Sequence, residues 1–311
     1  DLSACLDRQQ NEADPTASCQ LCVVLPPTPR FAGAWGIAKV GALEYPHLKV
    51  TRRHWGSLSP QQARPQLSQV LSSFHRNPHV PEAILTSSGR FLLPKLQRTE
   101  LRSAKAAQDA VFRSDGRYLI TGGTRGVGLA VATWLVATRG VRHVVLAGRR
   151  PASALRKDSL LGIKRMRSLG CHVDVVQCDV ADATQAKQLL RTLTQAAGAP
   201  RLRGIVHSAG LLRDAVIANC TAESLTQVMS IKSGIEAFVE FCSADAQLSE
   251  QLEMLVVFSS TSALFGQAGQ ASYVAANCFL DALAAQVAPD LQCSFRVSRK
   301  PKLPNHPLFS R

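Results

Sequence analysis

Residues 118–131, YLITGGTRGVGLAV, decide the fold. A short apolar run leads into Gly122, Gly126 and Gly128, and apolar residues at helical spacing follow. This order predicts a buried strand, a tight turn and a helix. Glycines at such a turn let the backbone pass close to a pyrophosphate over the helix N-terminus, so the stretch indicates a dinucleotide site.

The chain around this turn alternates short apolar strands with helices. The sequence predicts further strands over residues 143–148, 172–180, 203–210 and 252–260, and helices over 128–140 and 183–198. Such alternation is typical of an α/β fold with a doubly wound parallel sheet of the Rossmann type. We assign residues 110–290 to this unit, which we expect to be catalytic.

The first hundred residues form a different region. Residues 1–20 are polar and contain Asp14-Pro15, as a linker does. Residues 21–100 predict a smaller α/β unit with helices at 33–46 and 60–74 and a strand pair within 82–96. We expect this unit to be structural, because it contains no catalytic constellation.

Arginines at the second strand end favour NADPH over NADH. An NAD site usually has a carboxylate about 20 residues after the glycines, and here the strand ends in Arg149 and Arg150. A guanidinium fits a 2′-phosphate, and Arg125 within the turn adds a second positive charge. The predicted cofactor-binding residues are Thr121, Gly122, Gly123, Thr124, Arg125, Gly126, Val127, Gly128, Arg149, Asp179, Val180, Ser208, Ala209 and Gly210.

Residues 259–278, SSTSALFGQAGQASYVAANC, predict the catalytic groups. Reduction of a ketone needs a proton donor, and a tyrosine hydroxyl serves if a nearby cation lowers its pKa. We expect Tyr273 to be this donor, on a helix face shared with Asn277, and Ser260 to orient the carbonyl oxygen. The candidate cation is Lys232, on the helix that we expect before the strand at 252–260. Its alternative interpretation is a solvated helix lysine.

Together these motifs resemble the ketoreductase domain of modular polyketide synthases and the related reductase of animal-type fatty acid synthases, a branch of the short-chain dehydrogenases/reductases. In that branch lysine and asparagine have exchanged places, so the resemblance implies Lys232, Ser260, Tyr273 and Asn277 as the catalytic tetrad. Residues 33–46 and 82–96 resemble the truncated structural half of these domains. The resemblance covers about residues 21–290.

The resemblance also implies an activity and partners. We expect NADPH-dependent reduction of a β-ketoacyl thioester, carried on the phosphopantetheine of an acyl carrier protein, with other synthase domains in the same polypeptide. Two family markers concern product stereochemistry. Asp214 is kept from a Leu-Asp-Asp motif and Phe265 stands where the opposite class has tryptophan, so a D-type (B-type) product is expected; Arg213 departs from the motif.

The tail from Leu291 onward departs from the family. It holds five basic residues, no acidic residue and three prolines, and prolines prevent a regular helix. We assign residues 291–311 to an atypical basic tail. Residues 291–298, LQCSFRVS, could begin the last strand of the family, but residues 299–311 match nothing expected, so we expect the last strand and the lid helix to be absent or replaced. The alternative function is a structural or cofactor-binding remnant without turnover.

Composition restricts the remaining functions. The 311 residues carry a net charge of +14, which suits docking to an acidic carrier protein, although a solubilising role stays open. Basic residues are dispersed without aromatic interleaving, so we expect no nucleic acid partner. No apolar run is long enough for a membrane, and the nine cysteines show no metal-site spacing. We expect reduced thiols, no metal, and a cytoplasmic segment of a longer protein.

Overall fold

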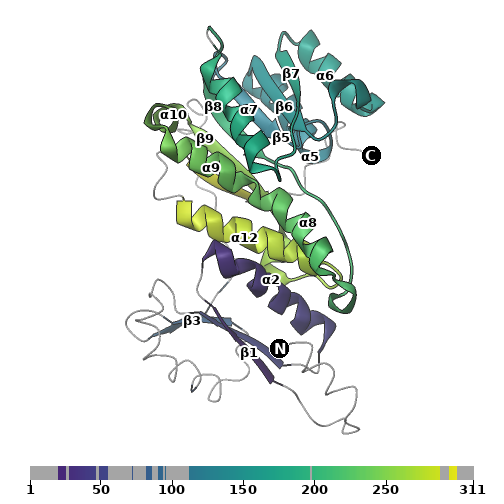
Figure 1. Cartoon of the computed structure of the whole chain (residues 1–311), viewed down its shortest axis with the longest axis vertical. Helices are drawn as coiled ribbons and strands as arrows, with labels where there is room; N and C mark the ends of the chain where they lie inside the picture. The colour runs from purple at the N-terminus through teal and green to yellow at the C-terminus, as the bar shows by residue number, and fades with distance from the viewer. Residues whose placement is uncertain are drawn as a thin grey trace.

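Two sheets form the framework of the chain in a computed structural model (Figure 1). The structure describes residues 20–25, 28–46, 49–54, 72, 82–85, 90–93, 95, 112–196, 198–287 and 294–299. The predicted linker up to residue 19 and most of the predicted helix at 60–74 lie outside these residues.

The larger sheet is parallel and doubly wound, as the sequence predicted. Its strand order is β10-β9-β8-β5-β6-β7, so the order reverses between β5 and β8, where such folds bind their ligands. The strands are β5 (Arg117–Thr121), β6 (His143–Gly148), β7 (His172–Gln177), β8 (Leu202–His207), β9 (Met254–Ser259) and β10 (Ser294–Arg299).

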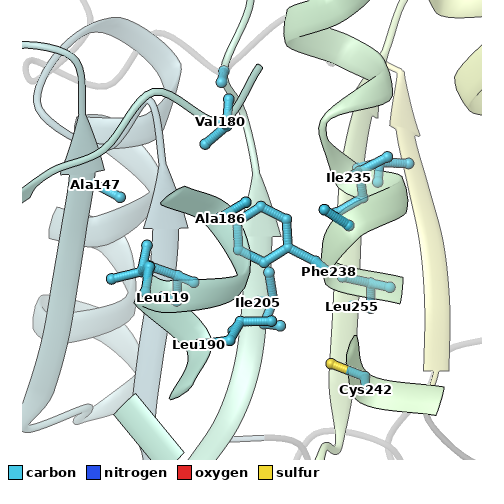
Figure 2. Packing of buried hydrophobic residues seen from close by; sticks show 14 of the residues in the cluster. Leu119, Ala147, Val180, Ala186, Leu190, Ile205, Ile235, Phe238, Cys242 and Leu255 are labelled. Carbon is cyan, nitrogen blue, oxygen red and sulfur yellow. The ribbon is translucent and has the colours of Figure 1, made fainter. Parts of the chain in front are cut away.

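Helices cover both faces of this sheet because its strands are apolar on both sides. On β5, Tyr118 and Ile120 pack with α5 (Gly126–Arg139) and α6 (Lys157–Ser168). Leu119 packs on the opposite face with α7 (Ala183–Gln195) and α9 (Ile235–Ala244). Figure 2 shows the Phe238 ring reaching from α9 toward Ala186 and Ile205 within this second core.

Local signals set several helix ends. Asp182 accepts hydrogen bonds from the backbone N–H groups of Thr184 and Gln185 and caps α7. Thr221 caps α8 (Ala222–Ser233) in the same way. Gly140, with φ of +69°, ends α5 in a left-handed conformation that glycine adopts without strain.

The smaller unit has the predicted mixed α/β composition. β1 (Gln20–Val24), β2 (Lys49–His54) and β3 (Glu82–Leu85) are parallel, and β4 (Phe91–Leu92) pairs antiparallel with β3, as expected of the predicted strand pair. Between β1 and β2 runs α2 (Pro29–Glu44), which begins at a proline and ends just before Tyr45-Pro46.

Helix α2 joins the two units by packing along α12 (Ala271–Val287), the helix that carries Tyr273 (Figure 1). The crossing is close: a Cβ atom built on Gly36 would lie 2.7 Å from Ala275 Cα and 2.8 Å from its backbone nitrogen. Glycine is therefore required at position 36 for the two backbones to approach this far.

Two features differ from the sequence interpretation. β10 pairs in parallel with β9, so the last strand is present and the sheet continues past the predicted boundary at residue 290. Helix α9 and the short α10 (Ala246–Gln251) lie between α8 and β9, so the helix of Lys232 does not directly precede that strand. Residues 291–293 and 300–311, the rest of the predicted tail, lie outside the described residues.

Candidate active site

The glycine turn after β5 forms an open cradle. Gly122 and Gly126 have φ values of +64° and +52°, which side chains rarely tolerate. A Cβ built on Gly126 would meet no atom within 4 Å, whereas one on Gly128 would lie 2.5 Å from Ser208 Oγ. Gly126 thus leaves space for a ligand, and Gly128 lets α5 start close to the end of β8.

A cavity of about 430 Å³ opens at this turn, at the carboxyl edge of the sheet. Twelve of the fourteen predicted cofactor-binding residues line it: Gly122, Thr124, Arg125, Gly126, Val127, Gly128, Arg149, Asp179, Val180, Ser208, Ala209 and Gly210. The ends of four strands therefore contribute to one cavity, at the point where the strand order reverses.

Thr121 and Gly123 do not line the cavity. The Thr121 hydroxyl is fully buried and lies 2.9 Å from His207 Nδ1. A Cβ on Gly123 would lie 2.6 Å from the carbonyl oxygen of Ile120. Both residues therefore support the loop from below instead of facing a ligand.

Six cavity residues were not in the predicted set of binding residues, although the sequence interpretation had noted Arg150 beside Arg149. They are Ala147, Gly148, Arg150, Cys178, Leu212 and Ile231. Four of them follow or end strands of the parallel sheet, which is a usable signal because ligands bind outside those ends. Leu212 and Ile231 lie in a loop and a helix and carry no local signal.

The cavity is electropositive at one end. Arg125, Arg149 and Arg150 are exposed, and Arg125 precedes the N-terminus of α5, whose backbone N–H groups favour an anion. Asp179, the only acidic lining residue among those described, accepts the backbone N–H of Ala181. Burial raises the pKa of the Cys178 thiol to about 11, so this cysteine is a neutral wall group.

These features fit a dinucleotide. The open space at Gly126 lies over the start of α5, where a pyrophosphate is best stabilised. The arginines follow β6, where the ribose 2′ position of a dinucleotide lies in this architecture. The opposite end of the cavity reaches Gly210 and Leu212.

Lys232 lies beside this far end. A Cβ built on Gly210 would be 3.4 Å from Lys232 Cε and 3.7 Å from its Nζ. The side chain is 4% exposed, and Nζ donates a 2.7 Å hydrogen bond to the carbonyl oxygen of Phe258 on β9. The structure therefore places Lys232 inside the protein next to the cavity, and the solvated-lysine interpretation is wrong.

Ser260 follows β9 directly and caps α11 (Thr261–Phe265). Its Oγ accepts hydrogen bonds from the backbone N–H of Ser262 at 3.2 Å and from the Ser262 hydroxyl at 2.9 Å. A hydroxyl oxygen has two acceptor positions and one proton. With both acceptor positions occupied, the Ser260 proton is left to donate to another group.

Tyr273 and Asn277 share one face of α12. The Asn277 side-chain amide donates a 2.8 Å hydrogen bond to the carbonyl oxygen of Tyr273, one helical turn earlier. Asn277 is fully buried, and its Oδ1 has no hydrogen-bond partner among the described residues. Such a buried acceptor is costly unless a donor reaches it. Tyr273 is half-buried.

His207 is a buried neighbour that the sequence interpretation did not use. Burial and, second, the charge of Lys232 lower the pKa of His207 to about 3. The ring is therefore neutral at physiological pH and adds no positive charge beside Lys232. The ring contacts the Thr121 hydroxyl on β5 and lies close enough to Lys232 for the lysine charge to act on it.

Both stereochemical markers are exposed at this end of the molecule, Asp214 in the loop after β8 and Phe265 at the end of α11. Asp214 accepts a 3.1 Å hydrogen bond from the Gln270 side chain, and Phe265 is 59% exposed. Neither residue lines the cavity.

Metal binding and membrane spanning find no support in the described part of the chain. No cluster of three potential metal ligands occurs there. No helix there is both long and apolar enough to cross a bilayer.

A doubly wound sheet with a glycine-lined cavity at its switch point defines a Rossmann-type protein of the short-chain dehydrogenase/reductase class. The family model of the KR domain matches residues 116–295, and the chain belongs to this family, the ketoreductase domains of polyketide synthases. The family expected from the sequence is confirmed.

Curated relatives are polyketide synthases. Polyketide synthase GfsA of Streptomyces halstedii is 34% identical over 266 residues, which cover 83% of this chain and 3% of that protein. A reducing polyketide synthase of Cochliobolus heterostrophus is 36% identical over 179 residues, which cover 58% of this chain and 7% of that protein. The chain thus spans a small part of these relatives.

Solved structures of ketoreductases have the same fold. A structure of A-type ketoreductases from a modular polyketide synthase is 27% identical with a TM-score of 0.72, covering 90% of this chain and 59% of that chain. A C2-type ketoreductase is 25% identical with a TM-score of 0.64, covering 91% and 59%. Because differently typed ketoreductases match, the overall likeness does not choose a stereochemical type.

Proposed function

We propose that this domain performs the NADPH-dependent reduction of a β-ketoacyl thioester on an acyl carrier protein to the β-hydroxyacyl form. The observation that carries the proposal is the continuity of the site. One cavity runs from the arginines after β6 to Gly210, and Gly210 lies against Lys232. Ser260 and the helix of Tyr273 follow the next strand of the same sheet edge.

The chain's own residues have distinct roles in this reaction. Bound NADPH supplies the hydride that reduces the β-carbon. The Tyr273 hydroxyl donates the proton to the forming alkoxide oxygen, and Ser260 donates a hydrogen bond to that oxygen. The Lys232 ammonium, held by the Phe258 carbonyl, stabilises the negative charge left on Tyr273. Asn277 supports the helical turn that carries the tyrosine.

Cofactor choice, partner and location belong to the same proposal. Arg149 and Arg150 favour a 2′-phosphate, and no carboxylate follows them directly. The net charge of +14 favours an acidic carrier protein. We place the reaction in the cytoplasm, within a larger synthase.

A D-type hydroxyl product is also part of the proposal. It is supported by the retained Asp214 and by phenylalanine, in place of tryptophan, at position 265. Chiral chromatography of the β-hydroxyacyl product measures it directly, and an L-configured product would refute this assignment.

Substitution of the proton donor tests the mechanism. Tyr273→Phe removes only the hydroxyl, so reduction of a β-ketoacyl N-acetylcysteamine thioester should fall at least about a hundredfold. NADPH affinity, measured by fluorescence titration, should stay within about twofold because Tyr273 is not among the residues that line the cavity. Near-normal turnover in this variant would show that another group donates the proton.

The inactive-remnant alternative rested on the atypical tail. The presence of β10 removes one of its supports, because the strand that was expected to be missing extends the sheet. NADPH binding without turnover in the unmodified protein would favour the remnant.

A further inference from the structure

Glu44, the last residue of α2, reaches from the smaller unit into the catalytic unit. Its Oε2 accepts the backbone N–H of Ile217 and its Oε1 accepts the backbone N–H of Gly269, both at 2.7 Å. These partners lie 173 and 225 residues further along the chain. A short N–H···O contact to a carboxylate is a charge-assisted hydrogen bond, stronger than a neutral one.

The two bonds hold two different loops. Ile217 begins the 3-10 helix Ile217–Asn219, which ends the loop after β8. Gly269 belongs to the loop between α11 and α12 and has φ of +76°, which favours glycine. One carboxylate therefore joins the segment that follows Gly210 to the segment that precedes Tyr273.

Further contacts show that the loops act as one unit around this carboxylate. Ala215 donates its backbone N–H to the Gly269 carbonyl at 2.8 Å, and Gln270 donates to Asp214. The Glu44 side chain is the member of this network that comes from the smaller unit.

The loops border the end of the cavity where substrate enters in the proposed function. Leu212 lines the cavity, and Leu212, Val216 and Phe265 expose large apolar side chains on the two loops or at the end of α11. Such exposed apolar groups at a cavity mouth suit an acyl chain. The relative position of the loops therefore sets the shape of the entrance.

We propose that Glu44 is a positioning residue that fixes the two substrate loops relative to each other and to Tyr273. That the loops hold the substrate rests on the proposed function. The two hydrogen bonds of the Glu44 carboxylate to the loops do not depend on turnover. The smaller unit then contributes to substrate positioning through this carboxylate, in addition to the hydrogen bond from Lys39 to the Ala263 carbonyl and to packing against α12.

The chemistry of the side chain predicts a graded response. A carboxylate offers an acceptor oxygen to each N–H, whereas the amide of Glu44→Gln offers one acceptor and presents its NH₂ group to the second N–H. Glu44→Gln should therefore keep one loop bond and lose the other. Glu44→Ala should lose both.

Amide hydrogen exchange tests the two hydrogen bonds to the Glu44 carboxylate without substrate. In Glu44→Ala, exchange at Ile217 and Gly269, followed by mass spectrometry of their peptides, should become about tenfold faster or more. In Glu44→Gln only one of the two peptides should respond. Glu250→Gln removes the same charge at an exposed position on α10 and should leave both peptides unchanged.

Kinetics separate positioning from a general loss of structure. Both Glu44 variants should lower kcat/KM for the thioester about tenfold or more and raise the share of the minor alcohol isomer, while NADPH affinity stays within about twofold. If Glu44→Ala does not fold, Glu44→Gln carries the test alone.

Unchanged exchange at both amides in Glu44→Gln would overturn the inference, as would an equal loss of NADPH affinity and thioester turnover. A wild-type protein without turnover would refute the proposed function instead, and the exchange result would still decide the role of Glu44.

Discussion

The α2–α12 crossing allows a stability prediction from two glycines on one helix. A Cβ at position 36 would lie 2.7 Å from Ala275 Cα, whereas one at position 33 would lie 3.5 Å from Met229 Cε and 3.8 Å from Ala275 Cβ. Favourable carbon contacts lie at about 3.5–4.0 Å, so Gly36→Ala must separate the helices by about 1 Å. Gly33→Ala fits without movement.

The magnitudes follow from these distances. Overpacking by one methyl group costs about 1–3 kcal/mol, and alanine in place of helical glycine returns about 1 kcal/mol. Gly36→Ala should therefore be destabilised by up to about 2 kcal/mol. Gly33→Ala should be stabilised by about 0.5–1 kcal/mol, because it gains helix propensity without a clash.

Urea unfolding of the whole chain, followed by circular dichroism, measures the difference. Because Ala275 is two residues from Tyr273, Gly36→Ala should also lower turnover by about 10- to 100-fold while NADPH affinity is kept. A Gly36→Ala protein as stable as Gly33→Ala would refute the close crossing. A normal turnover with reduced stability would refute only its influence on the tyrosine.

Three further variants test the cavity and its surroundings. Arg149→Ala should raise the KM for NADPH about 10- to 100-fold and leave the KM for NADH unchanged. Lys164→Ala is the charge-matched control. Equal losses of affinity for both cofactors would count against a 2′-phosphate contact. Ser262→Ala should lower kcat about 2- to 10-fold at constant NADPH affinity, because Ser260 loses one of the two hydrogen-bond donors to its hydroxyl oxygen. As a control, Thr261→Ala at the exposed neighbouring position should leave kcat unchanged. The depressed pKa of His207, about 3 against roughly 6.5 when unfolded, means that its stabilising contribution is present above pH 6.5 and is lost as the pH falls toward 3. Between pH 7 and 5.5 the wild type should lose about 1 kcal/mol more unfolding free energy than His207→Asn, and parallel urea titrations with equal losses would refute this.

The sequence predicted the catalytic fold well because its signals are local. Buried parallel strands appear as short apolar runs, and the glycine turn after Ile120 has a composition that few other structures need. The smaller unit was predicted through α2 and the β3–β4 pair. Helix α6 was not predicted, because charged residues dominate it and few apolar positions mark its buried face.

The site was predictable to the extent that it lies at strand ends. The tetrad depended on a family resemblance and stays a prediction, because nothing in the spacing of Lys232 and Tyr273 indicates a shared site. Glu44 escaped prediction for a physical reason: its two partners are chosen by tertiary packing, across more than 170 residues. The contact between Ser262 and Ser260 is local, and the sequence interpretation did not consider it. The tail was judged too pessimistically, since edge strand β10 needs only six residues to pair with β9.

The close crossing of α2 and α12 also limits how such domains can be recombined between synthases. A chimera that joins the smaller unit of one parent to the catalytic half of another would combine positions 36 and 275 from different sequences. Any side chain introduced at position 36 would push away the helix that carries Tyr273. Helices α2 and α12 should therefore come from the same parent in such a chimera.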